Sequence, residues 1–334
     1  METFSSKSSH VRSETTWPDI DVVIPTLNCE RNLEMCLNRL RSQNYNGKLN
    51  IIIVDGGSKD ETIKVAERYS CIVKVIPGIY LNGKNGAKMV GELMGHSEFI
   101  WHVDSDNFIV GTHAAENLVK ALIDNPDCNI AVPVNYPKRT YNKKHSKFSR
   151  YLNEFINQIE TDKIRNMCNR GKKNGNNYIV KDMDVGITNA SMIRRSAEEA
   201  VGFYDSDVEM LKRLRKRGLA DGVVVADTFF EQAAISTFMG YVFKNVRRVK
   251  FFAKKASNSF TDFFVEPENI GGHFSVNPLL QSINLYLGEM IKALKSRKKE
   301  NFYFIASLVA NILILLYSLP SVLRILLRTR FMHK

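Results

Sequence analysis

Two carboxylates lie two residues apart in the stretch 98–107, which reads EFIWHVDSDN. Asp104 and Asp106 follow an apolar run that predicts a buried strand. Aspartates at the end of a strand are either solvated turn residues or oxygen ligands. Carboxylate oxygens at this spacing suit a hard divalent cation, and a cation held there can bridge a diphosphate. The stretch therefore raises a metal site as the first hypothesis.

Short β-rich runs alternate with helical patterns through the first part of the chain. The runs are bounded by turn residues and cover 20–24, 50–54, 72–76, 98–103 and 129–132. Apolar residues recur at spacings of three and four between them, which predicts helices over 33–40, 60–69, 86–94 and 113–123. Strands that alternate with helices predict an α/β fold with an open, mainly parallel sheet.

Polar residues gather where three of these strands are expected to end. The first strand runs into PTLNCE at 25–30, the second into DGGSKD at 55–60 and the fourth into DSD at 104–106. In open α/β sheets, ligands bind beyond the carboxyl ends of the strands. The Asp-Gly-Gly-Ser turn taken alone is equally typical of an ordinary loop, but the three segments together predict one site.

These segments resemble those of the family 2 glycosyltransferases, which are nucleotide-sugar enzymes of the GT-A fold. The resemblance rests on VVIPTLN at 22–28, VDGGS at 54–58, GAK at 86–88 and DSD at 104–106, in the order and spacing of the family. It covers roughly residues 20–250. It implies a single Rossmann-like, mainly parallel sheet flanked by helices, and a UDP- or GDP-sugar as donor.

The family pattern implies roles for residues around the donor. Asp106 would bind the metal, Mg2+ or Mn2+, and Asp104 would complete the metal site by contacting the ribose or a metal-bound water. Asp55 would accept a hydrogen bond from the base, and Lys88 would meet the base or a phosphate. The residues that would frame the base and ribose are Pro25, Thr26, Asn28 and Glu30.

The second half of the resemblance is expected to shape the acceptor site. Residues 209–214, EMLKRL, match a helix that follows an acidic pair in the family, so the catalytic aspartate aligns with Asp207. Ser206 replaces the usual glutamate of that pair. Asp207 would take the proton of an acceptor hydroxyl during direct displacement at the anomeric carbon, with inversion. A carboxylate at a helix start is also typical of a simple cap.

A basic trio follows this helix and is formed by Lys244, Arg247 and Arg248. It would either neutralise the leaving phosphates or form the solvated face of an amphipathic helix. The chain has no Gln-x-x-Arg-Trp motif of processive synthases, which favours the addition of a single sugar. His102 is expected in the core, or supporting the site from behind, rather than as a metal ligand.

The net charge of +12 is unevenly distributed. Residues 138–181 carry twelve basic and three acidic side chains, and 291–334 carry nine and one, so the remainder sums to about -5. This distribution disfavours a general nucleic-acid surface, and we expect no nucleic-acid partner. The five cysteines include no CxxC pair, which favours a reducing, cytosol-facing location.

An uncharged run of 22 residues covers 302–323, the length of one bilayer-spanning helix. Basic residues flank it on both sides, so they do not settle its topology. Pro320 also allows a hairpin or re-entrant segment, and a buried core helix is the alternative to any membrane segment. We expect a location at the cell membrane with the catalytic domain facing the cytoplasm.

The expected organisation starts with a flexible tail (1–18) and a GT-A domain (19–250) with a nucleotide-sugar half (19–135) and an acceptor half (136–250). A basic juxtamembrane connection (251–300) and a membrane segment (301–327) follow. The functional hypothesis is a metal-dependent, inverting, hexosyltransferase-like enzyme that adds one sugar to a hydroxyl of a lipid-linked saccharide. The alternatives are a polyprenyl- or dolichyl-phosphate sugar synthase and a membrane-tethered nucleotide-sugar-binding protein without turnover.

Overall fold

A computed structural model describes the fold over most of the first 233 residues. The described residues are 17–79, 85–135, 150, 161–183, 190–203, 207–233, 237, 239–243, 246, 312–313 and 316–317. The chain divides into two compact units, of which the first comprises Met1–Val134 and Lys163–Glu231 and the second Asn135–Asp162 and Gln232–Lys334. All predicted site residues with described positions belong to the first unit.

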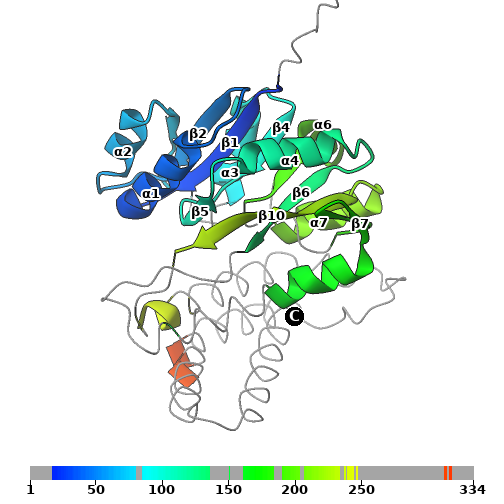
Figure 1. The fold of residues 1–334 in the computed structure, drawn as a ribbon. Coiled ribbons are helices and arrows are strands. Elements are labelled where there is room, and N and C mark those ends of the chain that lie inside the picture. The colour runs from blue at the N-terminus through cyan, green and yellow to red at the C-terminus, as the bar shows by residue number, and fades with distance from the viewer. Residues whose placement is uncertain are drawn as a thin grey trace, which may run out of the picture. The chain divides into compact units, whose positions relative to one another are not determined.

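Four parallel strands form one side of the sheet in the first unit (Figure 1). β2 pairs with β1 and β3, and β1 also pairs with β4. Every residue of β1 is buried, as expected of a strand in a parallel sheet covered by helices. The four strands are β1 (Ile20–Thr26), β2 (Leu49–Asp55), β3 (Ile72–Val75) and β4 (Phe99–His102).

Helices join the parallel strands, because a parallel pair needs a crossover connection. α3 packs against β1 and β2, and an added Cβ at its Gly91 would lie 2.5 Å from Cγ1 of Val23. The predicted helical spacing in α1 is confirmed by its buried residues, which are Leu33, Cys36, Leu37 and Leu40. The helices of this half are α1 (Glu30–Arg41), α2 (Thr62–Arg68), α3 (Asn85–Met94) and α4 (Ala114–Ile123).

The other side of the sheet contains antiparallel pairs. β9 pairs in this sense with β4 and β6, and β8 with β10 and β7. The strand order is β3-β2-β1-β4-β9-β6-β10-β8-β7, and β5 pairs with β10 outside this path. The strands are β5 (Asn107–Val110), β6 (Ile130–Asn135), β7 (Lys172–Asn174), β8 (Asn177–Val180), β9 (Met192–Arg194) and β10 (Gly222–Gln232).

The expectation of a mainly parallel sheet therefore holds only for β3-β2-β1-β4, and the whole sheet is mixed. β7 reads KKN and is exposed, so no apolar pattern marks it. β7 and β8 are joined by a tight turn in which Gly175 adopts a left-handed φ of 59°. Antiparallel strands can be joined by a tight turn and need no crossover helix. The alternation of strand and helix patterns in the sequence, which predicts parallel pairing, therefore does not predict these strands.

Two helices follow β9 and pack against each other. α6 (Arg195–Val201) packs against β9 and α7 (Asp207–Lys216), and α7 confirms the helix predicted over 209–214. Arg213 of α7 donates from Nη2 to the carbonyls of Gly202, at 3.2 Å, and Phe203, at 2.9 Å. These bonds tie the end of α6 to α7.

A buried ion pair joins the first strand to α6. Arg195 donates from Nη2 to Oδ2 of Asp21 at 2.7 Å, and from Nε to the Ser97 carbonyl at 2.7 Å. Its Nη1 donates to the carbonyl of Glu92 at 2.9 Å. An added Cβ at Gly95 would lie 2.2 Å from Oδ2 of Asp21, so glycine allows this close approach. One arginine thereby fixes β1, α3 and α6 to one another.

Arg195→Met should destabilise the protein by about 3 kcal/mol or more, because the buried carboxylate of Asp21 loses its cation. The control is Glu98→Gln, which breaks a 2.8 Å pair with Arg194 in which the glutamate side chain is 57% exposed. That change should cost less than about 1 kcal/mol. Urea-induced unfolding measures both free energies, and equal losses would contradict the assignment of Arg195 as a structural tie.

None of the helices in the described ranges is long and apolar enough to cross a bilayer. The predicted membrane segment (301–327) lies outside those ranges except for Ile312, Leu313, Leu316 and Tyr317. The tail (1–18), apart from its last two residues, and the connection (251–300) also lie outside them. Within the second unit, Leu313 packs against a small buried cluster that includes Val242. The membrane segment stays a prediction.

Candidate functional site

The carboxyl ends of β1, β2 and β4 meet at one edge of the sheet. Thr26 and Asp55, the last residues of β1 and β2, are register partners. Val23 of β1 is the register partner of His102, the last residue of β4. The turn after β4 therefore begins beside the last residues of β1, at the same edge of the sheet as the loops that follow β1 and β2, as the sequence predicts.

The carboxylate of Asp55 holds the first two loops together. It is fully buried, and its Oδ2 accepts hydrogen bonds from Oγ1 of Thr26 at 2.8 Å and Oγ of Ser58 at 2.6 Å. Its Oδ1 accepts from the backbone N–H groups of Gly57 at 2.9 Å and Ser58 at 2.7 Å. A carboxylate offers about four acceptor positions. The predicted contact of Asp55 with a base would add to a group that already accepts four bonds, and it stays a prediction.

The loop after β1 is tied to the loop after β2 by further hydrogen bonds. Asn28 has a left-handed φ of 49°, donates from its N–H to Oγ of Ser58 at 2.8 Å, and accepts at Oδ1 from the N–H of Lys59 at 2.8 Å. Oε2 of Glu30 accepts from the N–H of Glu61 at 3.1 Å. Asn28 is exposed, whereas the predicted donor residues before it in β1, Pro25 and Thr26, are buried.

The two aspartates of the DSD triplet lie in a tight turn between β4 and β5. The N–H of Asn107 donates to the carbonyl of Asp104 at 2.8 Å, and Oδ1 of Asn107 accepts from the N–H of Asp104 at 3.1 Å. Burial raises the pKa of the Cys36 thiol well above its usual value, and the charges of Asp106 and Asp104 add to the rise. Both carboxylates therefore lie near this residue of α1.

Lys88 is placed behind this turn rather than at its open side. It lies in the first half of α3, its side chain is only 1% exposed, and its Nζ is 3.4 Å from Oδ1 of Asp104. The Asp104 side chain is 12% exposed, so the carboxylate of this pair reaches the solvent whereas the lysine does not. Lys88 thus compensates the charge of the turn, and its predicted contact with a base or phosphate remains untested.

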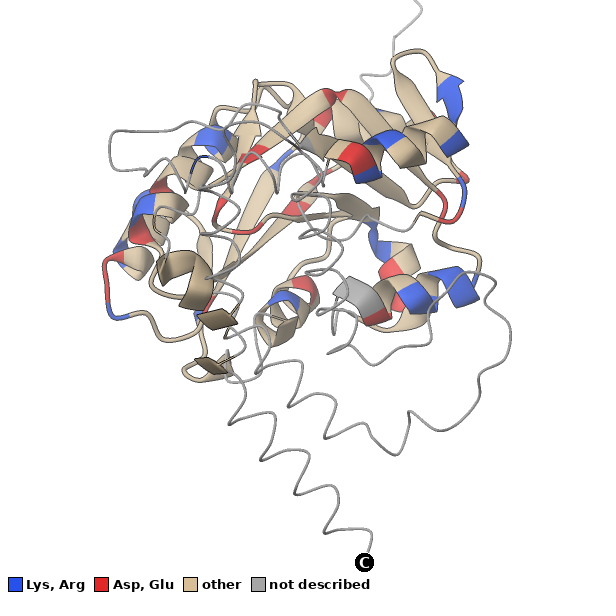
Figure 2. Ribbon diagram, turned by 90° about the horizontal axis from the view of Figure 1, so that it is seen from below, with Lys and Arg blue, Asp and Glu red and all other residues tan. Residues whose placement is uncertain are grey.

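Three buried ionisable side chains lie close to the start of the turn, and only His102 among them was considered from the sequence. Nε2 of His102 is 2.7 Å from Oε1 of Glu198 and 3.5 Å from Oε1 of Glu92, and all three side chains are fully buried. Figure 2 shows acidic positions, in red, among the central strands as well as on the outer helices. Glu92 lies one helical turn after Lys88, and this spacing places both side chains on one face of the helix. The spacing could therefore have predicted from the sequence that Glu92 lies near Lys88.

The two carboxyl groups of this cluster, Glu92 and Glu198, have strongly raised pKa values. Burial raises the pKa of Glu92 to about 9, with a further rise from Glu198. Burial also raises the pKa of Glu198 to about 8, against the opposing charges of Arg195 and Lys88. Near neutral pH, both groups therefore retain protons that an exposed glutamate would lose.

The acceptor-side residues are described only in part. Asp207 is the first residue of α7, as its predicted place at a helix start requires, but its side chain lies outside the described part of the structure. Arg247 and Arg248 also lie outside the described residues. Their predicted roles beside the acceptor and the phosphates stay predictions.

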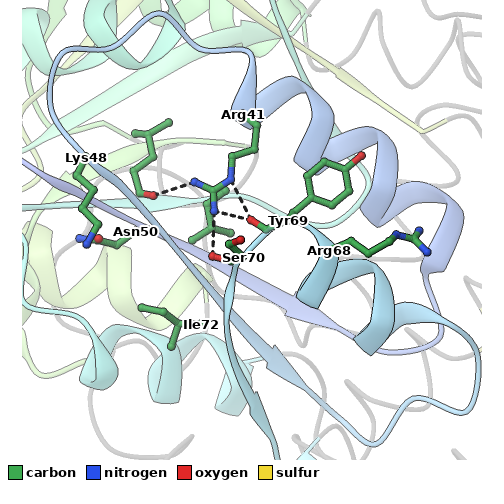
Figure 3. A pocket seen from close by; sticks show the side chains of 9 residues that line it. Arg41, Lys48, Asn50, Arg68, Tyr69, Ser70 and Ile72 are labelled. Carbon is green, nitrogen blue, oxygen red and sulfur yellow. Dashed lines mark hydrogen bonds between the residues drawn. The ribbon is translucent and has the colours of Figure 1, made fainter.

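A cavity of about 560 Å³ lies at the amino ends of β2 and β3, at the edge opposite the candidate site (Figure 3). Arg41 at the end of α1 donates from Nη2 to the carbonyls of Tyr69 at 2.7 Å and Ser70 at 3.2 Å. These contacts fasten the loop between α2 and β3. Because ligands of α/β sheets bind at the carboxyl ends of strands, we do not assign a ligand to this cavity.

Residues 21–202 match the family Glycosyl transferase family 2, which is more than half of the chain. The chain therefore belongs to this family. The matched range contains the three loops of the candidate site and the buried cluster beneath them. The family resemblance predicted from the four sequence segments is confirmed.

Curated relatives match shorter stretches. An N-acetylglucosaminyltransferase of Mesorhizobium japonicum is 33% identical over 101 residues, which cover 28% of this chain and 23% of that protein. Glycosyltransferase AglE of Haloferax volcanii is 39% identical over 57 residues, which cover 17% of this chain and 19% of that protein. The chain thus spans about a quarter or less of the length of these two relatives.

A mannosyltransferase of Pyrobaculum calidifontis, solved in complex with GDP-Man and Mn2+, has a similar fold. The superposition has a TM-score of 0.51 at 16% sequence identity and covers 93% of this chain and 88% of that chain. At this identity, the likeness concerns the fold alone. An α/β domain with a mixed sheet and flanking helices fits the predicted GT-A fold.

The buried carboxyls predict a fall in stability with rising pH. The unfolded chain loses their protons near a pKa of 4.5, whereas the folded state keeps them to about 8 and 9, so unfolding becomes easier across this window. Glu92→Gln should flatten the decline of the unfolding free energy between pH 5 and pH 9. Exposed Glu67→Gln serves as the control. Urea titrations at each pH measure the profile, and a Glu92→Gln profile parallel to that of the wild type would refute the assignment.

Proposed function

We propose that this chain is a membrane-associated, inverting glycosyltransferase that transfers one sugar from a nucleotide-diphosphate sugar to a hydroxyl of a lipid-linked saccharide. The observation that carries the proposal is the convergence of the DSD turn with the loops after β1 and β2 at one sheet edge. This edge lies within the family match over 21–202. Such an edge is where α/β sheets bind nucleotides.

The loops after β1 and β2 are suited to hold the nucleoside part of a UDP- or GDP-sugar. The buried carboxylate of Asp55 fixes both loops, so the donor would meet a rim that needs little ordering on binding. Exposed Asn28 presents a polar side chain at this rim, and partly exposed Glu30 follows it. We assign base and ribose contacts to this rim as a whole, with Asp55 as its internal fastening.

The turn after β4 fits a hard divalent cation, Mg2+ or Mn2+. Asp104 and Asp106 are partly exposed carboxylates held in one tight turn, and oxygen donors of this type suit both cations. A cation bound there would supply positive charge that offsets the negative charge of the donor diphosphate. Lys88 lies behind Asp104 and orients its carboxylate through the ion pair.

Asp106→Ala should remove most transfer activity while the protein stays folded, because the cation loses a ligand. Asp127→Ala, at an exposed position of the same domain, should leave activity unchanged. The measurement supplies membranes from expressing cells with a panel of labelled nucleotide sugars and extracts the products into organic solvent. Excess EDTA should abolish transfer, and full activity in its presence would sink the metal assignment.

Asp207 is proposed as the general base. As the acceptor hydroxyl attacks the anomeric carbon, its proton passes to the carboxylate, the bond from that carbon to the diphosphate oxygen breaks, and the nucleoside diphosphate leaves. Attack from the opposite side inverts the anomeric centre. Arg247 and Arg248 are proposed to stabilise the leaving phosphates by their charge.

Asp207→Asn should lower turnover by roughly 100-fold or more, the usual scale for the loss of a general base. Donor affinity should stay nearly unchanged, because the base does not hold the nucleotide. Glu209→Gln, in the same helix, is the control and should retain activity. A polyprenyl phosphate is already an oxyanion and needs no base to remove a proton. Near-normal turnover of Asp207→Asn would therefore contradict the assigned base and favour a polyprenyl phosphate as the acceptor.

Membrane association is proposed from the uncharged run at 302–323 and its basic flanks. The full chain should stay in the membrane fraction through a carbonate wash, and a variant that ends after residue 298 should be retained less. Fractionation followed by immunoblotting measures both. A full chain that is freely soluble without detergent would assign the run to a protein core instead.

A further inference from the structure

The buried cluster of Glu92, His102 and Glu198 joins three separate elements beneath the DSD turn. Glu92 lies on α3, His102 ends β4, and Glu198 lies on α6. Nε2 of the histidine contacts both glutamates, at 2.7 Å from Glu198 and 3.5 Å from Glu92. The cluster therefore connects the helix that carries Lys88 with the strand that carries the turn and with the helix that leads towards α7.

Burying ionisable side chains such as these in a protein core is unfavourable for stability. Burying an ionisable side chain costs several kcal/mol by general estimates, and apolar side chains of similar volume often replace such groups without loss of stability. Burial raises the pKa of both glutamates, which reflects this cost. The cluster is thus better explained by a need for fixed geometry than by stability alone.

The geometry that the cluster fixes is that of Lys88 and Asp104. Glu92 follows Lys88 by one helical turn, so the two side chains share one face of α3. The charge of Lys88 acts on both Glu92 and Glu198. From the other side, Nζ of Lys88 lies 3.4 Å from Oδ1 of Asp104, and His102 precedes Asp104 by only two residues.

The cluster is less suited to hold a cation itself. The distance of 2.7 Å between Nε2 of His102 and Oε1 of Glu198 is that of a hydrogen bond. A cation bound by these two atoms would have to displace the proton of this hydrogen bond. Groups that orient metal ligands from behind typically change metal affinity or activity by about 10- to 100-fold when they are removed.

We propose that this buried cluster positions Lys88 and, through it, Asp104 for binding a divalent cation. The inference rests on the function proposed above, in which the DSD turn holds the cation. Its members are positioning residues, since they act through Lys88 and the backbone of the turn. The hydrogen bond between His102 and Glu198 also fixes the turn to α6, so the cation site and the acceptor-side helices share one fixed frame.

The test measures Mn2+ binding to the purified full chain by the loss of the electron paramagnetic resonance signal of free Mn2+. The main variant is the double change His102→Leu with Glu198→Leu, which replaces the hydrogen-bonded pair by apolar packing. Its thermal unfolding midpoint without metal should stay close to that of the wild type, while Mn2+ binding should weaken by about 10-fold or more. A merely structural role would leave Mn2+ affinity unchanged in a folded variant.

Glu198→Gln supplies a second variant that folds even if the double change does not. The amide keeps the shape of a protonated carboxyl and still bonds His102, so Mn2+ affinity should stay within about 3-fold of the wild type. Glu198→Ala, which removes the bond, should weaken binding by about 10-fold or more. Exposed Glu199→Ala, the adjacent position, should change nothing.

The outcomes separate this inference from the proposed function. If the wild type binds Mn2+, Asp106→Ala abolishes binding, and Glu198→Ala binds as tightly as the wild type, the positioning role is overturned while the cation site stands. Equal weakening by Glu198→Gln and Glu198→Ala would also overturn it, because the hydrogen bond would then not matter. If the wild type binds no Mn2+, the proposed cation site fails and this inference fails with it.

Discussion

The ion pair between buried Lys88 and Asp104 is the contact on which the candidate site depends. The turn after β4 brings two carboxylates, Asp104 and Asp106, to one sheet edge, and like charges so close repel each other until a cation compensates them. Lys88 supplies one such charge from inside the protein, with Nζ 3.4 Å from Oδ1 of Asp104. The remaining negative charge of the turn faces the solvent. In the proposed function, a divalent metal ion binds there and compensates it.

Elements from the N-terminal and the C-terminal part of the first unit hold this ion pair in place. α3 carries Lys88 and Glu92 and packs on β1 and β2, while Arg195 binds the Glu92 carbonyl from the start of α6. The same arginine pairs with Asp21 in β1 at 2.7 Å. The donor edge and the acceptor-side helices are therefore joined by buried polar contacts, whose geometry is directional, rather than by apolar packing alone.

The sequence was sufficient to predict the elements whose side chains face a core on a regular period. β1, β2 and α1 follow from their apolar patterns, and the convergence of their loops follows from the rule for parallel strands. The run at 129–132 marks β6, but its antiparallel pairing was not predicted, and β7 was missed because it is short, polar and exposed. The partners of His102 were missed because Glu198 lies 96 residues away in the chain, and only the fold brings it within 2.7 Å. The four hydrogen bonds that Asp55 accepts could not be predicted either, because a sequence motif gives the residue type and not its neighbours in space.

In the proposed function, the DSD turn of this chain binds the cation and the donor together. Manganese anomalous scattering from crystals of the protein grown with Mn2+ and a nucleoside diphosphate tests it most directly. We expect one peak within bonding distance of Asp106, beside the diphosphate and next to the rim formed by Asn28 and the Asp55 turn. A peak between His102, Glu92 and Glu198, with none at Asp106, would contradict it.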